Sequence, residues 1–223
     1  MQGWDDHWDA LYAEQGFRAK YPDEYVVRFT AGNFFKIKFQ DRTQIKVLDL
    51  GCGPGRHVIF LAKEGFSAFG IEGAASAIRL CQDKLAQEKL NAEVTTGDFV
   101  KMPYPDDYFD AIIDCCSIQH NQMPAVTQIC REIKRTLKPK GKLFSMVRTD
   151  KDYAFGLGRE LEKGTFTDYK EFDLNQVGHI HFFSESEIKG LFSIFSSFSY
   201  EYCERTFDNR TKAIKHWVIT AEK

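Results

Sequence analysis

Short apolar runs alternate with longer segments of helical periodicity along most of the chain. Residues 47–50 are apolar except for one aspartate and end at a glycine, which predicts a short buried strand. Four further runs predict strands at 67–71, 92–95, 111–116 and 142–147. Two segments with helical periodicity, 57–63 and 129–137, each precede one of these strands. Strands and helices in this alternation predict an α/β fold built on a parallel sheet.

The first predicted strand runs into three glycines at alternate positions, Gly51, Gly53 and Gly55. This spacing predicts a tight loop, because glycine adopts backbone conformations that other residues avoid. Strand, loop and following helix place backbone N–H groups at a helix N-terminus with no Cβ to keep a ligand away. The next predicted strand leads to Glu72, whose carboxylate can accept hydrogen bonds from ribose hydroxyls. Together these features predict a nucleoside-binding half-site. A chance glycine-rich turn is the alternative for the glycines alone.

The glycine spacing distinguishes this site from a dinucleotide site, which carries G-x-G-x-x-G. Here the spacing is G-x-G-x-G, preceded by Asp49. Segment 49–55 resembles motif I of the class I S-adenosylmethionine-dependent methyltransferases, [DE]-x-G-x-G-x-G. The tripeptide 97–99 after the third predicted strand and segment 131–143, which is similar to the family's R-x-L-K-P-G-G turn, extend the resemblance over residues 45–147. It implies that S-adenosylmethionine is the cofactor.

In that family the glycine loop approaches the methionyl and ribose parts of the cofactor, and the acid after the second strand holds the ribose. An acid after the third strand accepts a hydrogen bond from the adenine amino group, and an apolar neighbour packs on the ring. The resemblance thus implies these cofactor-binding residues: Asp49, Gly51, Cys52, Gly53, Gly55, Glu72, Gly73, Asp98, Phe99 and Cys115. Arg28, on a predicted helix that begins near Pro22 and runs to about Phe35, is a further candidate for the cofactor's carboxylate, because arginine suits bidentate recognition. An ordinary surface arginine is the competing interpretation.

The end of the chain predicts a closing hairpin, with alternating segments 198–207 and 213–221 around a turn at 208–209. In the family this hairpin completes a Rossmann-like α/β sheet of seven strands in the order 3-2-1-4-5-7-6, with strand 7 antiparallel and helices on both faces. We expect residues 1–223 to form a single methyltransferase domain. Its expected parts are an N-terminal helical cap (1–44), the cofactor-binding core (45–147), a substrate-lid insertion (148–183) and a C-terminal helix with the closing hairpin (184–223). The pattern S-x-x-E at 184–187 predicts a capping box at the start of that helix.

Three segments outside the core are predicted to shape an acceptor pocket. The N-terminal region carries Trp4, Trp8 and Tyr12 on one helical face, which either covers the cofactor or docks the extension onto the sheet. Segment 117–121 follows the fourth strand and in the family faces the transferable methyl group. Within it His120 is the candidate general base, because the unperturbed pKa of histidine lies near neutrality. A capping or packing role for His120 is the alternative.

The third segment, 148–183, mixes aromatic residues and glycines with charges, which suits a lid over a small acceptor or a dimer surface. These residues are Tyr153, Phe155, Gly156, Gly158, Phe166, Tyr169 and Phe172. His179 and His181 would share a face of an extended segment, but no third ligand for a metal can be placed beside them. We expect one of these histidines to line the pocket and the other to be structural.

Composition narrows the class of protein further. The chain has 223 residues, a net charge of −2 and 43% hydrophobic residues, including 20 phenylalanines, which is ample for a core. No basic face or tail indicates a nucleic-acid substrate, no apolar stretch approaches the ~20 residues that span a bilayer, and the N-terminus lacks a signal peptide. We therefore expect a cytoplasmic protein without nucleic-acid or membrane partners. The six cysteines form no metal-binding pattern and are expected to be reduced.

The sequence therefore predicts an S-adenosylmethionine-dependent methyltransferase that acts on an oxygen or nitrogen of a small-molecule acceptor. Three alternatives stay open. An NAD-linked oxidoreductase is opposed by the glycine spacing and the closing hairpin. A non-catalytic methyltransferase-like binding subunit is opposed by the intact glycine motif and both acidic positions. A protein or RNA methyltransferase is disfavoured by the near-neutral charge and by the sequence Cys115-Cys116-Ser117 where an N-P-P-[YF] motif would stand. The acceptor's identity and the oligomeric state cannot be predicted.

Overall fold

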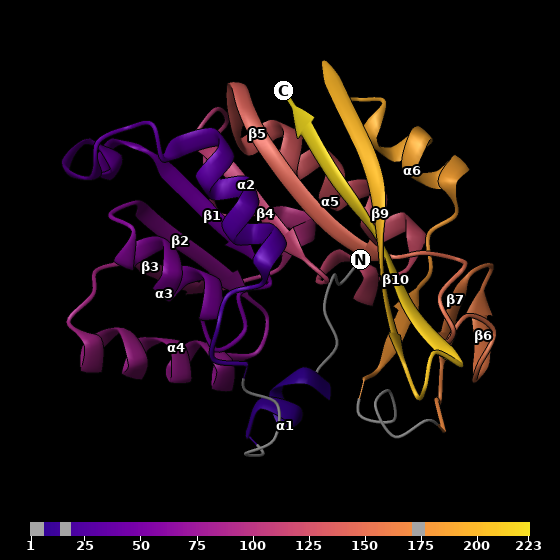
Figure 1. Cartoon of the computed structure of the whole chain (residues 1–223). Coiled ribbons are helices and arrows are strands. Elements are labelled where there is room, and N and C mark those ends of the chain that lie inside the picture. Colours follow the sequence, from indigo (N-terminus) through magenta and orange to yellow (C-terminus); the bar gives the residue numbers. More distant parts are fainter. Residues whose placement is uncertain (1–6, 14–18, 171–176) are drawn as a thin grey trace.

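A computed structural model describes residues 7–13, 19–170 and 177–223, which are arranged around one twisted seven-stranded sheet (Figure 1). The strand order is β3-β2-β1-β4-β5-β10-β9. Neighbours among the first five strands pair in parallel, and β10 pairs antiparallel with both β5 and β9. The predicted order 3-2-1-4-5-7-6 with an antiparallel seventh strand is confirmed. The strands are β1 Lys46–Leu50, β2 Ser67–Glu72, β3 Glu93–Thr96, β4 Phe109–Cys115, β5 Leu137–Arg148, β9 Ser197–Phe207 and β10 Lys212–Glu222.

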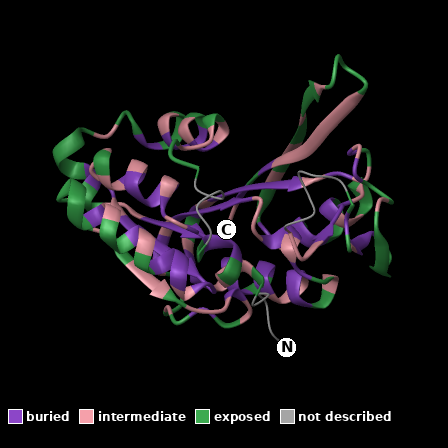
Figure 2. Ribbon diagram, turned by 90° about the horizontal axis from the view of Figure 1, so that it is seen from below, coloured by how far each residue is buried: buried purple, intermediate pink, exposed green. Residues whose placement is uncertain are grey.

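Helices cover both faces of the sheet. One apolar cluster joins the sheet to α2, α3 and α4, and the other joins its opposite face to α5 and α6. The buried side chains therefore lie in two layers along the central strands, and the outward faces of the helices are exposed (Figure 2). The helices are α1 His7–Ala13, α2 Glu24–Phe34, α3 Arg56–Lys63, α4 Ala75–Glu88, α5 Met123–Thr136 and α6 Glu185–Phe192, with short 3-10 helices η1 Phe39–Gln44, η2 Phe99–Lys101 and η3 Ile118–His120.

Local capping explains where several helices begin. The carboxylate of Asp23 accepts the backbone N–H of Tyr25 at the start of α2, and the predicted capping box between Ser184 and Glu187 is present at the start of α6. The prediction for α5 was wrong at its N-terminus, because the helix begins at Met123 rather than at residue 129. Pro124 lies in its first turn, where the missing N–H costs nothing.

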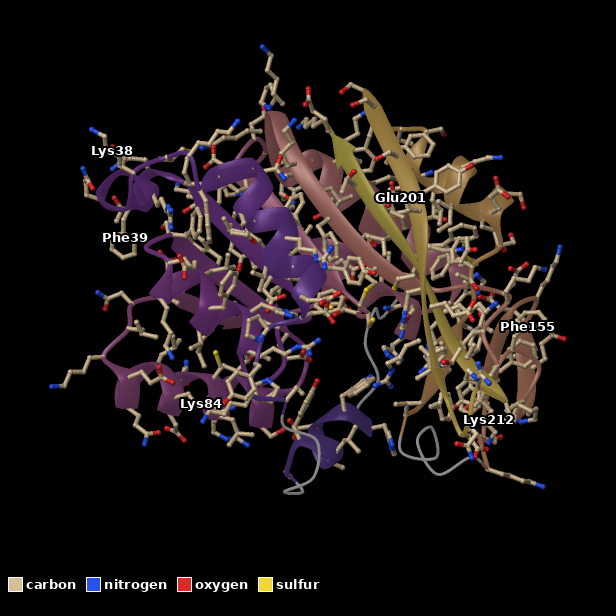
Figure 3. The ribbon with its side chains drawn as sticks, in the orientation of Figure 1. Lys38, Phe39, Lys84, Phe155, Glu201 and Lys212 are labelled. Atoms are coloured by element: carbon tan, nitrogen blue, oxygen red, sulfur yellow. The ribbon has the colours of Figure 1, made fainter. Side chains whose placement is uncertain are left out.

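The insertion after β5 folds into a small antiparallel sheet of its own. Its strands are β6 Arg159–Glu162, β7 Thr165–Thr167 and β8 His179–His181. A separate apolar cluster fills it, and Phe155, which Figure 3 labels, packs its ring against Phe166 and Phe182 at centroid distances of 5.3 and 5.9 Å. The backbone N–H of Phe183 donates to the carbonyl oxygen of Arg148, which ties the end of the insertion back to its beginning. Two predicted aromatic positions, Trp4 and Phe172, lie outside the described residues.

The six cysteines are all free thiols, as predicted. Within residues 7–13, 19–170 and 177–223, no helix is long and apolar enough to cross a membrane.

Candidate active site

A cavity of about 340 Å³ lies at the carboxyl ends of the central strands. In an open α/β sheet this edge is where ligands bind, because the loops after adjacent strands diverge there. The lining combines the glycine loop, the ends of β2 and β4, η3 and parts of the N-terminal region, the insertion and β10. Its residues are Trp8, Tyr12, Ala19, Gly51, Cys52, Gly53, Pro54, Arg56, His57, Glu72, Phe99, Cys115, Cys116, Ser117, Gln119, His120, Asn121, Arg148, Val177, Ile180 and His216.

The glycine loop bends closely around its neighbours. Gly51 has a φ of +70°, and a Cβ at this position would lie only 2.3 Å from the Oγ atom of Ser117. Any other residue would therefore meet both backbone strain and a steric clash. The N–H of Gly53 donates a 3.0 Å hydrogen bond to Oε2 of Glu72, so the loop is held against the end of β2.

Glu72 is buried at the cavity wall, with 7% of its surface exposed. Its Oε1 accepts the N–H of Ala74 at 3.0 Å, while Oε2 accepts that of Gly53. Burial raises the pKa of this carboxyl, and the backbone N–H donors oppose that rise. The backbone N–H of Gly73 is a third donor to this carboxylate, and the lone pairs that remain can accept hydrogen bonds from a ligand.

Behind the loop, Asp49 and His57 form a buried pair. Nδ1 of His57 lies 3.3 Å from Oδ1 of Asp49. Burial lowers the pKa of His57, but the Asp49 carboxylate outweighs burial and raises that pKa to about 9. The backbone N–H of Asp23 donates to Nε2 of His57 at 3.3 Å. This contact favours the neutral imidazole, so its effect on the pKa of His57 opposes that of Asp49. The pair joins β1 to the start of α2 through α3.

A chain of hydrogen bonds orients His120 on the other side of the cavity. The backbone N–H of Arg148 donates to Oε1 of Gln119 at 2.9 Å, which directs the amide nitrogen of Gln119 at Nε2 of His120, 3.4 Å away. Nδ1 of His120 lies 2.9 Å from the backbone oxygen of His179. A carbonyl oxygen only accepts, so the proton sits on Nδ1 and Nε2 carries the lone pair.

Helix α1 lies against this site. The carboxylate of Asp9 accepts the N–H of Ser76 at 2.7 Å, and its backbone oxygen accepts the Ser76 hydroxyl at 2.9 Å, which anchors α1 to the start of α4. The Trp8 ring meets the His120 ring edge-on, with centroids 4.7 Å apart. The buried side chain of Tyr12 packs against the glycine loop. A Cβ at Gly53 would lie only 2.9 Å from the Tyr12 hydroxyl oxygen.

Comparison with known proteins agrees with this geometry. Residues 47–141 match the family model of a methyltransferase domain. The chain is 37% identical over 101 residues to the methyltransferase GfsG of Streptomyces halstedii, a match that covers 44% of this chain and 36% of that protein. It is 29% identical over 136 residues to a ubiquinone biosynthesis O-methyltransferase of Bartonella tribocorum, covering 57% and 54%. The chain contains a class I S-adenosylmethionine-dependent methyltransferase domain.

A solved structure shares the fold. A SAM-dependent methyltransferase from Methanosarcina mazei superposes with a TM-score of 0.64 at 24% identity, covering 80% of this chain and 92% of that one. The chain matches only 36% and 54% of the length of the two curated relatives named above.

Most residues expected to hold the cofactor of this methyltransferase domain gather at the cavity. Those that line it are Gly51, Cys52, Gly53, Glu72, Phe99 and Cys115, with the candidate base His120 opposite. Gly55, Gly73 and the buried Asp49 are not among the lining residues. Asp98 caps η2 through a 2.9 Å bond from the N–H of Val100 and is not among the lining residues, whereas its neighbour Phe99 is.

Arg28 does not belong with this set. It lies on the exposed side of α2 with 73% of its side-chain surface accessible, next to Glu24 one turn earlier, and does not line the cavity. The periodicity of α2 explains the difference, since its buried face carries Val26 and Phe29 instead. Arg56, at the first position of α3, is the arginine that lines the cavity beside the glycine loop.

Sequence reasoning missed four basic residues of the lining, Arg56, His57, Arg148 and His216. The position of Arg56 directly after the glycine motif was an available signal. For Arg148 and His216 there was none, because strand pairing brings them together. The expectation that His179 or His181 lines the pocket with its side chain was wrong, since Ile180 between them does so. His181 is buried and bonds to the Thr165 hydroxyl at 2.7 Å.

Proposed function

We propose that the protein transfers a methyl group from S-adenosylmethionine to an oxygen or nitrogen atom of a small-molecule acceptor. The observation that carries the proposal is one cavity lined on one side by the glycine loop and Glu72 and on the other by His120 with its lone pair on Nε2. A surface that suits a nucleoside and a candidate general base thus share one cavity.

The residues on the cofactor side suit the parts of S-adenosylmethionine. Glu72 can accept hydrogen bonds from ribose hydroxyls through its remaining lone pairs. The buried ring of Phe99 offers an apolar surface for adenine. Arg56 offers a guanidinium to the methionyl carboxylate, a role that we expected of Arg28 from the sequence. Gly51 and Gly53 let the backbone approach without a Cβ in the way.

When bound, the cofactor supplies an electrophilic methyl group, so the chain's own task is to position two substrates and manage one proton. His120 would take the proton of a hydroxyl acceptor at Nε2, because Nδ1 is already bonded to the carbonyl of His179, and the acceptor hydroxyl would replace the 3.4 Å contact from the Gln119 amide nitrogen to Nε2. Trp8, Val177 and Ile180 add apolar walls that exclude water around the acceptor. Holding the reacting atoms in line in such a pocket supplies much of the rate.

The size of the cavity favours a small acceptor. Its volume of about 340 Å³ is near the lower end of ordinary ligand pockets, about 300–1,000 Å³. The name of the ubiquinone biosynthesis O-methyltransferase adds support for an oxygen acceptor. The chain's net charge of −2 adds nothing for a nucleic-acid substrate.

Calorimetric titration with S-adenosylhomocysteine tests the cofactor half of the proposal. Wild type should bind one equivalent, and Glu72→Gln should weaken binding by at least 10-fold, because an amide replaces one of two acceptor oxygens. The matched control is Glu201→Gln on exposed β9, labelled in Figure 3, which should bind like wild type. A mass-spectrometric screen of small acceptors then tests transfer. Binding without methylation of any acceptor would favour a non-catalytic subunit, and absence of binding by folded wild type would reject the proposal.

A further inference from the structure

Two arginines, Arg56 and Arg148, line the cavity among the residues that the structure describes, and the cofactor has one carboxylate. Arg56 stands beside the glycine loop, whereas Arg148 lies at the end of β5, on the side of the cavity that His120 occupies. If Arg56 faces the cofactor's carboxylate, Arg148 is left for a different anion. Arg148 is ion-paired with Asp152, and the N–H donors that this pair leaves over are available to an anionic group of a ligand.

Arg148 is built into the wall rather than lying loosely on it. Its Nη1 bonds to Oδ1 of Asp152 at 2.9 Å, and the Asp152 side chain is fully buried, with 0% exposure. Asp152 also accepts the N–H groups of Ala154 and Lys215, at 2.9 and 2.8 Å. The Arg148 side chain keeps 11% of its surface accessible. A guanidinium has five N–H donors. Among the described residues, the Arg148 guanidinium bonds to Asp152, so donors remain for a ligand.

His216 stands directly opposite Arg148 in the antiparallel pairing of β5 and β10. Directly opposed side chains share a face of the sheet, with Cβ atoms about 4.5–5.5 Å apart. Both residues line the cavity. Two side chains with N–H donors so placed can bind one anionic group between them.

The rest of the lining matches that charge. The described lining residues include a single acid, Glu72, and its carboxylate is committed to the glycine loop through Gly53 and to Ala74. The wall formed by His120, Arg148 and His216 carries no acid among the described residues other than the buried Asp152 that anchors Arg148. This side of the cavity is therefore complementary to a negative charge.

We propose that the methyl acceptor carries a carboxylate, which Arg148 and His216 bind while the nucleophilic atom faces His120. The inference rests on the proposed function, since it names the acceptor class of the same site. A planar carboxylate matches two parallel N–H donors of a guanidinium. A phosphate group is also an anion that a guanidinium can bind, and the experiment below distinguishes it from a carboxylate.

The test uses ligand-observed NMR on the protein saturated with S-adenosylhomocysteine, with benzoate, phenyl phosphate and uncharged benzamide as probes. Benzoate should bind saturably and benzamide at least 10-fold more weakly. Arg148→Gln should weaken benzoate at least 10-fold and His216→Gln several-fold. Because Arg148→Gln leaves Asp152 buried without its partner, the double variant Arg148→Gln/Asp152→Asn is measured as well. Arg28→Gln, an exposed arginine, is the control and should bind like wild type.

Each result bears on a distinct claim. Benzamide binding as well as benzoate, no benzoate binding, or benzoate binding that survives loss of Arg148 in a folded variant would overturn the inference. Phenyl phosphate binding at least 10-fold more tightly than benzoate would overturn the carboxylate in favour of a phosphate. In all these cases S-adenosylhomocysteine still binds. Failure of S-adenosylhomocysteine to bind would instead reject the proposed function.

Discussion

Nδ1 of His120 lies 2.9 Å from the backbone carbonyl oxygen of His179, across 59 residues of sequence. The contact joins the loop after β4 to β8 of the insertion, so the insertion sets the tautomer of the candidate base. The same insertion supplies Val177 and Ile180 to the cavity wall. Base orientation and acceptor enclosure therefore depend on one structural unit.

Replacing His120 by glutamine should slow transfer to a hydroxyl acceptor by about 10²–10⁴-fold, the usual contribution of a general base. Binding of S-adenosylhomocysteine should change less than two-fold, since Glu72 and the glycine loop are untouched. The measurement is the single-turnover rate with the acceptor found by the screen. His7→Gln, an exposed histidine on α1, is the control. An unchanged rate in His120→Gln would assign His120 a packing role.

The buried pair of Asp49 and His57 predicts a pH-dependent contribution to stability. The pKa of His57 is about 9 in the folded protein, against about 6.5 for an unperturbed histidine. A raised pKa stabilises the fold fully below pH about 6.5, and that stabilisation is lost as the pH rises through about 9. In Asp49→Asn burial acts without the carboxylate, so the pKa of His57 should fall below 6.5.

NMR titration of the imidazole nitrogens measures this pKa, with Asp41→Asn on exposed η1 as the control. The difference in free energy of unfolding between wild type and Asp49→Asn should be on the order of 2 kcal/mol larger at pH 6 than at pH 9.5. A His57 pKa that does not respond to Asp49→Asn would contradict the pairing.

The cysteines offer a direct footprint of the cofactor site. Cys116 is half-buried and lines the cavity, and Cys203 is half-buried on β9 away from it. Burial raises the pKa of Cys81 and of Cys130 to about 12, so these thiols should react slowly. A pulse of iodoacetamide followed by peptide mass spectrometry should label Cys116 and Cys203 first. Saturating S-adenosylhomocysteine should protect Cys116 and leave Cys203 reactive. Labelling of Cys116 that is the same with and without S-adenosylhomocysteine would place the ligand elsewhere.

Arg135 predicts a stability effect remote from the site. Its guanidinium bonds to both carboxylate oxygens of Glu132 at 2.7 and 2.8 Å and to the backbone oxygens of Met102 and Tyr104. Lysine cannot reproduce this fork, so Arg135→Lys should lower the free energy of unfolding by about 1–3 kcal/mol. Urea denaturation measures the change. Arg131→Lys on the exposed side of α5 should leave the midpoint within error, and an equal effect of both variants would contradict the bidentate contacts.

The sequence by itself determined the parallel core, the strand order that the resemblance implied, the capping box at Ser184 and most of the cofactor side of the cavity. These features are local, because a glycine loop, a capping residue and a strand that ends in an acid are each written within a few consecutive residues. Glu72 could be placed at the cavity because it ends the predicted strand that follows the glycine loop and its helix. The first turns of α5 were missed although Ala125 and Val126 continue the buried face of Ile129 and Cys130.

Only the tertiary structure decided the acceptor side. Arg148 meets His216 through the register of β5 and β10, and His120 meets the backbone of His179 through the path of the insertion. The sequence could not decide whether Arg28 or Arg56 lines the cavity, because this depends on which face of each helix is turned toward it. Periodicity reports neighbours within one helix or strand, whereas strand register and loop path determine which distant segments meet, and no local pattern encodes them.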